Sequence, residues 1–240
     1  LPRIKQQTGA ILNITTGGGM GMSMDERLAP ALAAAPELAS MNMGSFNFNI
    51  AAAARALRAP SHDWEQPYLE NSKGLIMSNT FTQIERAMRE LGDKGTKFEF
   101  ECYDVGHLYN LAHFADMGLI KPPFFVQCIL GITGAIGAAP ENLIFMKNTA
   151  DRLFGKDYLF SVLGAGRHQF PMITMGAIMG GNVRVGLEDN LYLNKGELAP
   201  SNAAQVSKIR RILAELGLEV ATPDEARAIL GTKGAAQVSF

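Results

Sequence analysis

The chain has 240 residues, a length that allows one large domain or two small ones. Hydrophobic residues make up 47% of it and charged residues 19%, which provides for a sizeable core and excludes disorder for most of the chain. The 22 Lys and Arg oppose 23 Asp and Glu, and this net charge of -1 argues against binding to nucleic acid or to an acidic membrane surface. We expect a single domain over residues 1–240.

Short apolar runs alternate with helical patterns along the chain, which is typical of βα units around a parallel sheet. Six strands are predicted, at residues 10–15, 38–43, 97–103, 124–130, 158–163 and 182–188. The clearest helical patterns cover residues 25–35, 81–91, 141–154 and 202–216, and we expect Asp25, Thr80 and Ser201 to cap the first, second and fourth of them. A last short helix is predicted to follow the cap Thr222-Pro223.

Two segments depart from this alternation. Residues 45–79 contain an alanine-rich stretch, two prolines and the single tryptophan, and we interpret them as an inserted loop with a role in function or assembly. Residues 232–240 carry no period and are predicted to form a loose C-terminal tail.

The cysteines and the apolar runs indicate the cellular compartment in which we expect the protein. Cys102 and Cys128 lie in apolar runs without metal-ligand spacing, so we interpret them as buried thiols of a cytoplasmic protein. The most apolar stretch, residues 124–139, is shorter than a membrane span. We therefore expect no membrane segment.

The number of strands leaves two architectures open. A closed parallel barrel needs eight strands, whereas an open six-stranded sheet would leave two edges to protect. Residues 1–7 lack an initiator Met and have the pattern of a helix already under way. We therefore expect an α/β fold of the TIM (β/α)8 barrel type whose first two βα units are missing from this chain, so that residues 1–240 hold units 3 to 8.

The last predicted strand carries the strongest candidate site. Period-two alternation places Arg184 and Glu188 on the barrel-facing side, with Asp189 at the carboxyl end. Barrel enzymes place catalytic groups at that end of their strands. The open alternative is a structural ion pair that closes the barrel.

Two further segments add candidate residues. The predicted strand 97–103 alternates Glu99 and Glu101 with apolar residues, and clustered carboxylates in one lumen require a cation, a metal or a protonated partner. Residues 15–21 form a glycine-rich turn between a strand and a helix, whose amides could hold a carboxylate or phosphate. Salt bridging among the strands and a tight turn remain the structural alternatives.

These segments resemble the β-keto acid cleavage enzymes, whose founding activity is 3-keto-5-aminohexanoate cleavage. The resemblance covers nearly the whole chain and rests on residues 13–18, 36–48, 101–104, 164–169 and, most specifically, 183–190. It implies a zinc-dependent barrel enzyme, a cytoplasmic homo-oligomer (a tetramer), that converts a β-keto acid and acetyl-CoA into acetoacetate and a new acyl-CoA.

Site roles follow from the resemblance alone. Zinc would be held by Glu188 and by two histidines of a His-x-His segment that is expected upstream of Leu1. The general base would be Asp189, with Arg184 as its orienting partner and Thr16 as an assisting hydroxyl. The implied substrate contacts are Gly17, Gly19 and Asn42 on the carboxylate side and Glu101 at the far end.

Two other functions remain open. One is a zinc-dependent aldolase or hydrolase on a similar barrel that uses no acyl-CoA, and the other is a non-catalytic oligomeric binding protein. The acids near Glu101 suggest a cationic or amine-bearing β-keto acid, but the sequence does not define the substrate's side chain.

Overall fold

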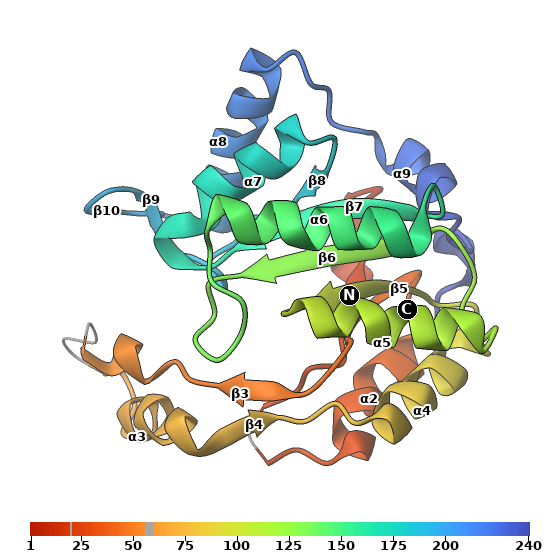
Figure 1. Cartoon of the computed structure of the whole chain (residues 1–240), viewed down its shortest axis with the longest axis horizontal. Coiled ribbons are helices and arrows are strands. Elements are labelled where there is room, and N and C mark those ends of the chain that lie inside the picture. The colour runs from red at the N-terminus through yellow and green to blue at the C-terminus, as the bar shows by residue number, and fades with distance from the viewer. Residues whose placement is uncertain (20, 56–59) are drawn as a thin grey trace.

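The computed structural model describes residues 1–19, 21–55 and 60–240. Its main sheet has six parallel strands in the order β1-β2-β5-β6-β7-β8 (Figure 1). The strands are β1 (Asn13–Thr15), β2 (Leu38–Asn42), β5 (Lys97–Cys102), β6 (Phe124–Leu130), β7 (Tyr158–Gly164) and β8 (Asn182–Val183). The predicted α/β class is confirmed, although the first and last strands are shorter than the sequence indicated.

Side-chain contacts between distant strands demonstrate that the sheet is curled. Arg184, directly after β8, donates to Glu101 on β5, which is three strands away. Three strand spacings would separate these backbones by about 14 Å on a flat sheet. The fold is therefore a curled, half-barrel sheet. Within the described residues β1 and β8 do not pair with each other.

The helices that pack on the convex side of the sheet are α2 (Met24–Ala34), α4 (Phe81–Gly92), α5 (Val105–Asp116), α6 (Pro140–Phe154) and α7 (Gln169–Ile178) (Figure 1). The chain also contains α1 (Pro2–Gln7), α8 (Asn202–Glu215) and α9 (Pro223–Leu230). Side-chain caps predicted from the sequence at Thr80, Ser201 and Thr222 are present, each accepting a hydrogen bond from the third residue of its helix. The first such cap is Ser23 and not Asp25.

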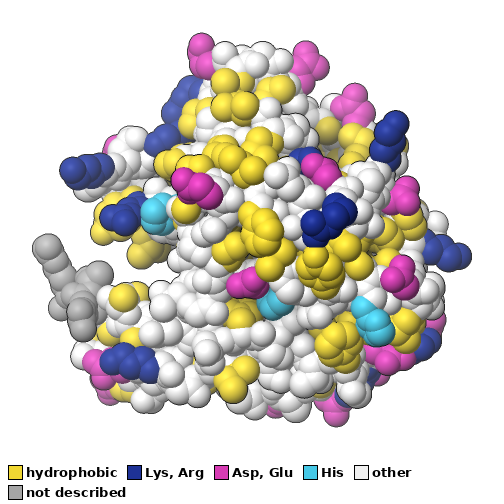
Figure 2. Space-filling model, viewed as in Figure 1, with side chains coloured by type: hydrophobic (Ala, Val, Ile, Leu, Met, Phe, Trp, Pro, Cys, Tyr) yellow, Lys and Arg dark blue, Asp and Glu magenta, His cyan; other side chains and the backbone are white. Residues whose placement is uncertain are grey.

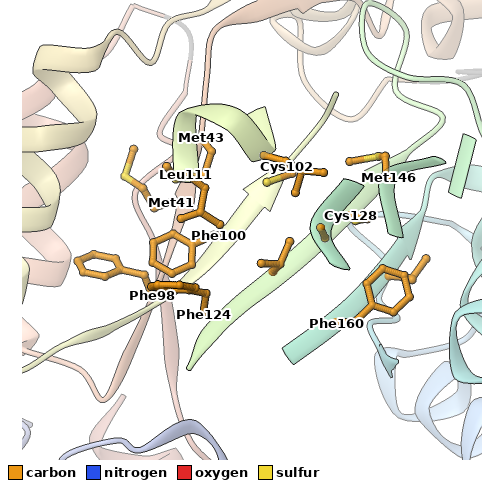
Figure 3. Packing of buried hydrophobic residues seen from close by; sticks show 14 of the residues in the cluster. Met41, Met43, Phe98, Phe100, Cys102, Leu111, Phe124, Cys128, Met146 and Phe160 are labelled. Carbon is orange, nitrogen blue, oxygen red and sulfur yellow. The ribbon is translucent and has the colours of Figure 1, made fainter. Parts of the chain in front are cut away.

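Hydrophobic residues of alternate strand positions form the core between sheet and helices. Phe98, Phe100 and Cys102 of β5 point into this layer, where they pack with side chains of β2, β6, β7 and α5 (Figure 3). Both cysteines are free and fully buried, as predicted. Period-two alternation therefore leaves the other side of each strand for the concave face.

The segment predicted as an inserted loop contains regular structure. It holds an antiparallel pair, β3 (Phe46–Phe48) and β4 (Leu75–Met77), with α3 (Glu65–Asn71) between them, and it projects from the body of the molecule (Figure 1). Two short 3-10 turns, Ala51–Arg55 and Ser72–Gly74, complete the described part. A second small hairpin, β9 (Tyr192–Asn194) with β10 (Glu197–Leu198), follows β8.

The final residues, expected to be loose, are anchored. Thr232 donates to the buried carboxylate of Glu37 at 2.8 Å, and the Ser239 amide donates to Ala34 O at 2.8 Å. Lys5 of α1 donates to Phe240 O at 2.8 Å, so the two ends of the chain lie side by side. Aperiodic sequence therefore does not mean free chain here, because backbone and polar groups supply the contacts.

The surface carries charges of both signs. On the face seen in Figure 2, Lys and Arg are interspersed with Asp and Glu, and hydrophobic side chains occur in separate patches. This mixture agrees with the net charge of -1. None of the described helices is both long enough and apolar enough to cross a bilayer.

Candidate active site

The concave face of the sheet encloses an open cavity of about 1460 Å³. Residues from all six strands line it, together with the loops after β1 and β8, parts of the β3–β4 excursion and α8. Seven of the eight predicted site residues are in its lining: Gly17, Gly19, Asn42, Glu101, Arg184, Glu188 and Asp189. The cavity lies where the curl brings distant strands together.

A polar row crosses the cavity floor. Register pairing aligns Asn42 of β2 with Glu101 of β5, Glu101 with Gln127 of β6, and Gln127 with Ser161 of β7. All four side chains are buried. Gln127 donates to Ser161 Oγ at 3.1 Å, while its Oε1 finds no partner in the described part of the chain. Buried polar groups are normally paired, so this row is arranged for something other than stability.

Arg184 is the centre of an ion cluster above that row. Its guanidinium donates to Glu101 Oε1 at 2.9 Å, to both oxygens of Asp189 at 3.2 and 3.3 Å, and to Glu188 Oε2 at 3.2 Å. One arginine thus joins β5 to the loop after β8. The predicted Arg184–Asp189 pairing is present in the structure.

Burial dominates the protonation equilibria of the cluster. Burial, then repulsion from Glu99, raises the pKa of Glu101 to about 8 although Arg184 opposes the shift. Burial also raises the pKa of Asp189 against the effect of Arg184. Burial alone would lower the pKa of Arg184, but Asp189 and the neighbouring carboxylates outweigh it and raise that pKa. The guanidinium therefore stays charged, while Glu101 holds a proton near neutral pH.

Glu188 differs from its predicted position. Strand β8 ends at Val183, so Glu188 lies on a turn and not on the inner face of a strand, and its side chain is 85% exposed. The loop is held by side chains, since Gly186 N donates to Gln169 and Leu187 N donates to Asn202. These contacts replace strand pairing and explain the shorter strand.

Thr16 is the one predicted site residue that the structure keeps away from the cavity. Its side chain is 1% exposed and donates to the backbone of Ser40 at 2.8 Å, on the side opposite Thr15. Thr15 lines the cavity instead, and its hydroxyl accepts from Gly17 N at 3.0 Å. Alternation in β1 thus assigns the exposed hydroxyl to Thr15.

The described residues do not by themselves form a metal site. No group of three or more His, Cys, Asp or Glu side chains in this part of the chain is arranged to hold a metal ion. His107 is engaged elsewhere, because its Nδ1 accepts from Tyr103 N at 3.2 Å. Glu188 alone does not make a zinc site, so the residues present do not fit the metal and no chemical step is assigned to it.

Several cavity residues are not among the predicted site residues: Asn13, Thr15, Arg27, Ser40, Tyr103, Gln127 and Ser161. The sequence contains a signal that could have identified Ser40, Gln127 and Ser161 as cavity residues. Each is a polar residue in a largely apolar strand. Register pairing places Ser40 beside Glu99, Gln127 beside Glu101, and Ser161 beside Gln127. Arg27 lies on a helix, and its sequence position gave no indication of the cavity.

Comparison with known proteins supplies the family. A family model described as "beta-keto acid cleavage enzyme" matches residues 1–232. The chain is 54% identical over 240 residues to a 3,5-dioxohexanoate:acetyl-CoA acetone transferase of Paraburkholderia graminis, covering 100% of this chain and 77% of that protein. It is 35% identical over 222 residues to a 3-keto-5-aminohexanoate cleavage enzyme of Acetoanaerobium sticklandii, covering 92% and 71%.

Solved structures agree on the architecture. One described as "Apo structure of ObcA" superposes with a TM-score of 0.71 at 18% identity, covering 95% of this chain and 52% of that one. A "Ternary complex of ObcA with C4-CoA adduct and oxalate" gives a TM-score of 0.68 at 19% identity, covering 95% and 54%. At such identities the likeness concerns the fold alone. The chain spans about half the length of these solved structures.

Proposed function

The chain belongs to the family of beta-keto acid cleavage enzymes, and from this premise we propose that it exchanges acyl groups between a β-keto acid and acetyl-CoA. The products are acetoacetate and a new acyl-CoA. The observation that carries the proposal is the cluster in which Arg184 holds Asp189 and Glu101 at the wall of a large cavity.

Asp189 is proposed as the general base. Its carboxylate is held by two contacts from Arg184, and burial raises its pKa toward the range of an effective base. It would remove a proton from C2 of the β-keto acid, whose position between two carbonyl groups makes it acidic. Arg184 acts as the positioning residue, because it fixes the carboxylate.

The rest of the reaction follows from carbonyl chemistry. The C2 enolate attacks the thioester carbonyl of acetyl-CoA and expels the CoA thiolate. The thiolate then adds to the C3 ketone, and the C2–C3 bond breaks in a retro-Claisen step that yields the new acyl-CoA. The enolate of acetoacetate takes the proton back from Asp189, so the enzyme returns to its starting state.

For the substrate we propose a 3,5-diketo acid such as 3,5-dioxohexanoate. The relative named for that compound is 54% identical, whereas the relative named for 3-keto-5-aminohexanoate is 35% identical. The raised pKa of Glu101 supports this choice over an amine-bearing acid, because a protonated carboxyl donates a hydrogen bond to a ketone oxygen. Asn42, Gly17 and Gly19 line the same cavity and are proposed to contact the carboxylate side of this substrate.

The direct test is consumption of 3,5-dioxohexanoate by the full-length protein with and without acetyl-CoA. The proposal expects turnover only with acetyl-CoA, and acetoacetate with acetoacetyl-CoA as products. Equal consumption without acetyl-CoA would support an aldolase or hydrolase instead. A parallel assay with 3-keto-5-aminohexanoate ranks the two substrate classes.

Zinc and the closed barrel are further parts of the proposal. Glu188 is proposed as one zinc ligand, and its partners would have to come from outside the described residues. The unpaired edges of β1 and β8 in the described sheet are proposed to be completed by further strands of a (β/α)8 barrel, since exposed edges are usually covered. Metal analysis and a crystal structure of the full-length protein test both.

The remaining expectations belong to the same proposal. We propose that residues 1–240 belong to one domain, with 45–79 as an insertion and 232–240 as the tail. A homotetramer in the cytoplasm is proposed for the whole protein. A single cooperative unfolding transition, light scattering and cell fractionation test these points in turn.

A further inference from the structure

Tyr103 is a cavity residue without a role in the proposed reaction. It follows β5 directly and lines the cavity together with Glu101 of the same segment. Within the part of the chain that the structure describes, its hydrogen bonds involve the backbone, and its hydroxyl forms none. The hydroxyl of a tyrosine that leaves water usually has a partner. This half-buried hydroxyl is therefore available to a bound molecule.

Segments that follow β2, β5 and β6 hold Tyr103 in place. Its ring stacks on Phe46, the first residue of β3, with the ring centroids 4.2 Å apart and the ring planes at 23°. Its amide donates to His107 Nδ1 at 3.2 Å, and its carbonyl oxygen accepts from the amide of Ile136, in the loop after β6, at 2.9 Å. A Cβ at Gly44 would lie 2.5 Å from His107 Cδ2, so the glycine lets His107 approach. Because the ring is fixed before a ligand binds, a hydrogen bond from its hydroxyl costs little conformational entropy.

The hydroxyl of Tyr103 stays protonated in these surroundings. Burial, then the charge of Glu101, raises the pKa of Tyr103 well above its ordinary value. The hydroxyl is therefore a neutral donor at physiological pH. Arg184, the strong donor of this wall, is already engaged by three carboxylates. A ketone oxygen accepts a hydrogen bond from a hydroxyl but not from a carboxylate, so Tyr103 is a suitable partner for a ketone on an acidic wall.

The place of Tyr103 in the chain indicates which substrate oxygen it meets. The substrate carboxylate is proposed to lie against Gly17, Gly19 and Asn42, and the far end of the substrate against Glu101. Tyr103 is two residues beyond Glu101 and lines the same cavity, so it lies at the far end as well. In a 3,5-diketo acid that end carries the C5 ketone, whose oxygen has lone pairs for two donors.

We propose that the Tyr103 hydroxyl donates a hydrogen bond to the C5 ketone oxygen of a 3,5-diketo acid, and that Tyr103 is a specificity-determining residue for this class of substrate. The inference rests on the proposed function and deepens it by naming the residue that recognises the second ketone. A β-keto acid with a methylene group at C5 leaves this hydroxyl without a partner, which weakens its binding relative to the diketo acid.

Tyr103→Phe tests the inference, because it removes one oxygen atom and keeps the ring that stacks on Phe46. The full-length protein is assayed with acetyl-CoA and either 3,5-dioxohexanoate or 3-oxohexanoate, which lacks the C5 ketone. We expect kcat/KM for 3,5-dioxohexanoate to fall about tenfold and kcat/KM for 3-oxohexanoate to change by less than about twofold. An equal change for both substrates would indicate a structural role, and no change for either would leave the hydroxyl without a role. Both outcomes overturn the inference.

Tyr68→Phe is the matched control. Tyr68 belongs to α3 and lines the same cavity, so this change removes another tyrosine hydroxyl from the cavity wall. It is expected to leave kcat/KM for both substrates unchanged. If Tyr68→Phe lowers the preference for 3,5-dioxohexanoate as much as Tyr103→Phe does, the assignment to Tyr103 is wrong.

A binding measurement separates this inference from the proposed reaction. Acetoacetyl-CoA is the product expected from 3,5-dioxohexanoate, and butanoyl-CoA differs from it only in lacking the ketone. By calorimetry we expect the wild type to bind acetoacetyl-CoA about tenfold more tightly than butanoyl-CoA, and Tyr103→Phe to bind both with equal affinity. A wild type that shows this preference but turns over neither acid would refute the proposed function alone. Equal affinities in the wild type, or the same preference in Tyr103→Phe, would overturn the inference whether or not turnover occurs, and failure of both acyl-CoAs to bind would refute both.

Discussion

The two faces of the curled sheet are built from alternate residues of the same strands, yet they differ in every physical respect. On β5, Phe98 and Phe100 enter the core beneath the helices (Figure 3). Glu99 and Glu101 of the same strand line the cavity. The convex face gains stability from apolar burial. The concave face holds carboxylates whose burial opposes folding unless Arg184 and bound groups compensate them.

This difference distinguishes residues that stabilise the fold from residues that are proposed to take part in the reaction. Core side chains are interchangeable within limits of size and shape. The cavity residues are not, because each depends on a named partner: Glu101 and Asp189 on Arg184, and Gln127 on Ser161. Mutations on the two faces are therefore expected to separate stability from activity.

The largest expected effect is on the convex face. Phe100→Ala removes a ring that is 3% exposed, and we expect a loss of about 3–5 kcal/mol in the free energy of unfolding. Urea denaturation measures it, and kcat per folded molecule is expected to stay near that of the wild type. A large fall in kcat with unchanged stability would contradict the assignment of stability to the convex face and of activity to the concave face.

On the concave face, Asp189→Asn removes the proposed base while leaving an amide of the same shape. We expect kcat to fall about 10²-fold or more, which corresponds to ~2.7 kcal/mol in the barrier. Steady-state kinetics measure this loss, and circular dichroism checks the fold. Unchanged activity would support the non-catalytic reading, in which the cluster is a structural ion network.

Because of Glu101, the contribution of the concave face to stability depends on pH. Its folded pKa of about 8 lies above the ordinary value of 4.5, so its stabilising contribution is complete below pH 4.5 and is lost as the pH rises to about 8. Relative to Glu101→Gln, the wild type is expected to lose up to ~1.4 kcal/mol per pH unit across that window. Denaturation of both proteins from pH 4.5 to 8 tests this. If the stability of the wild type and that of Glu101→Gln change in parallel with pH, the raised pKa does not belong to Glu101.

The smallest expected effects come from two adjacent threonines, Thr15 at the end of β1 and Thr16 directly after it. Thr16→Val removes a buried hydrogen bond to Ser40, so we expect a loss of about 1 kcal/mol in stability and no change in kcat/KM. Thr15→Val alters the cavity wall and is expected to change KM for the β-keto acid by a few fold. The reverse pattern would support the assisting role that the family resemblance implies for Thr16.

Strand alternation predicted much of this site. The pattern of residues 97–102 gave both the core and the acidic wall, because period two in a six-residue strand leaves little ambiguity. Thr16 was expected at the site from the family resemblance, but it directly follows the three-residue strand β1 and its side chain is buried against Ser40. Glu188 was misplaced because Gln169 and Asn202, distant in sequence, hold the loop after β8. The Arg184–Glu101 contact depends on the curl, which no local pattern encodes.

The central claim is acyl exchange with acetyl-CoA, and an isotope label tests it most directly. The full-length protein is incubated with unlabelled 3,5-dioxohexanoate and acetyl-CoA carrying ¹³C at the acetyl carbonyl, and the products are followed by NMR. The proposed mechanism places the label at C3 of acetoacetate and leaves the new acyl-CoA unlabelled. Label appearing only in free acetate, or remaining in acetyl-CoA while the β-keto acid is consumed, would contradict it.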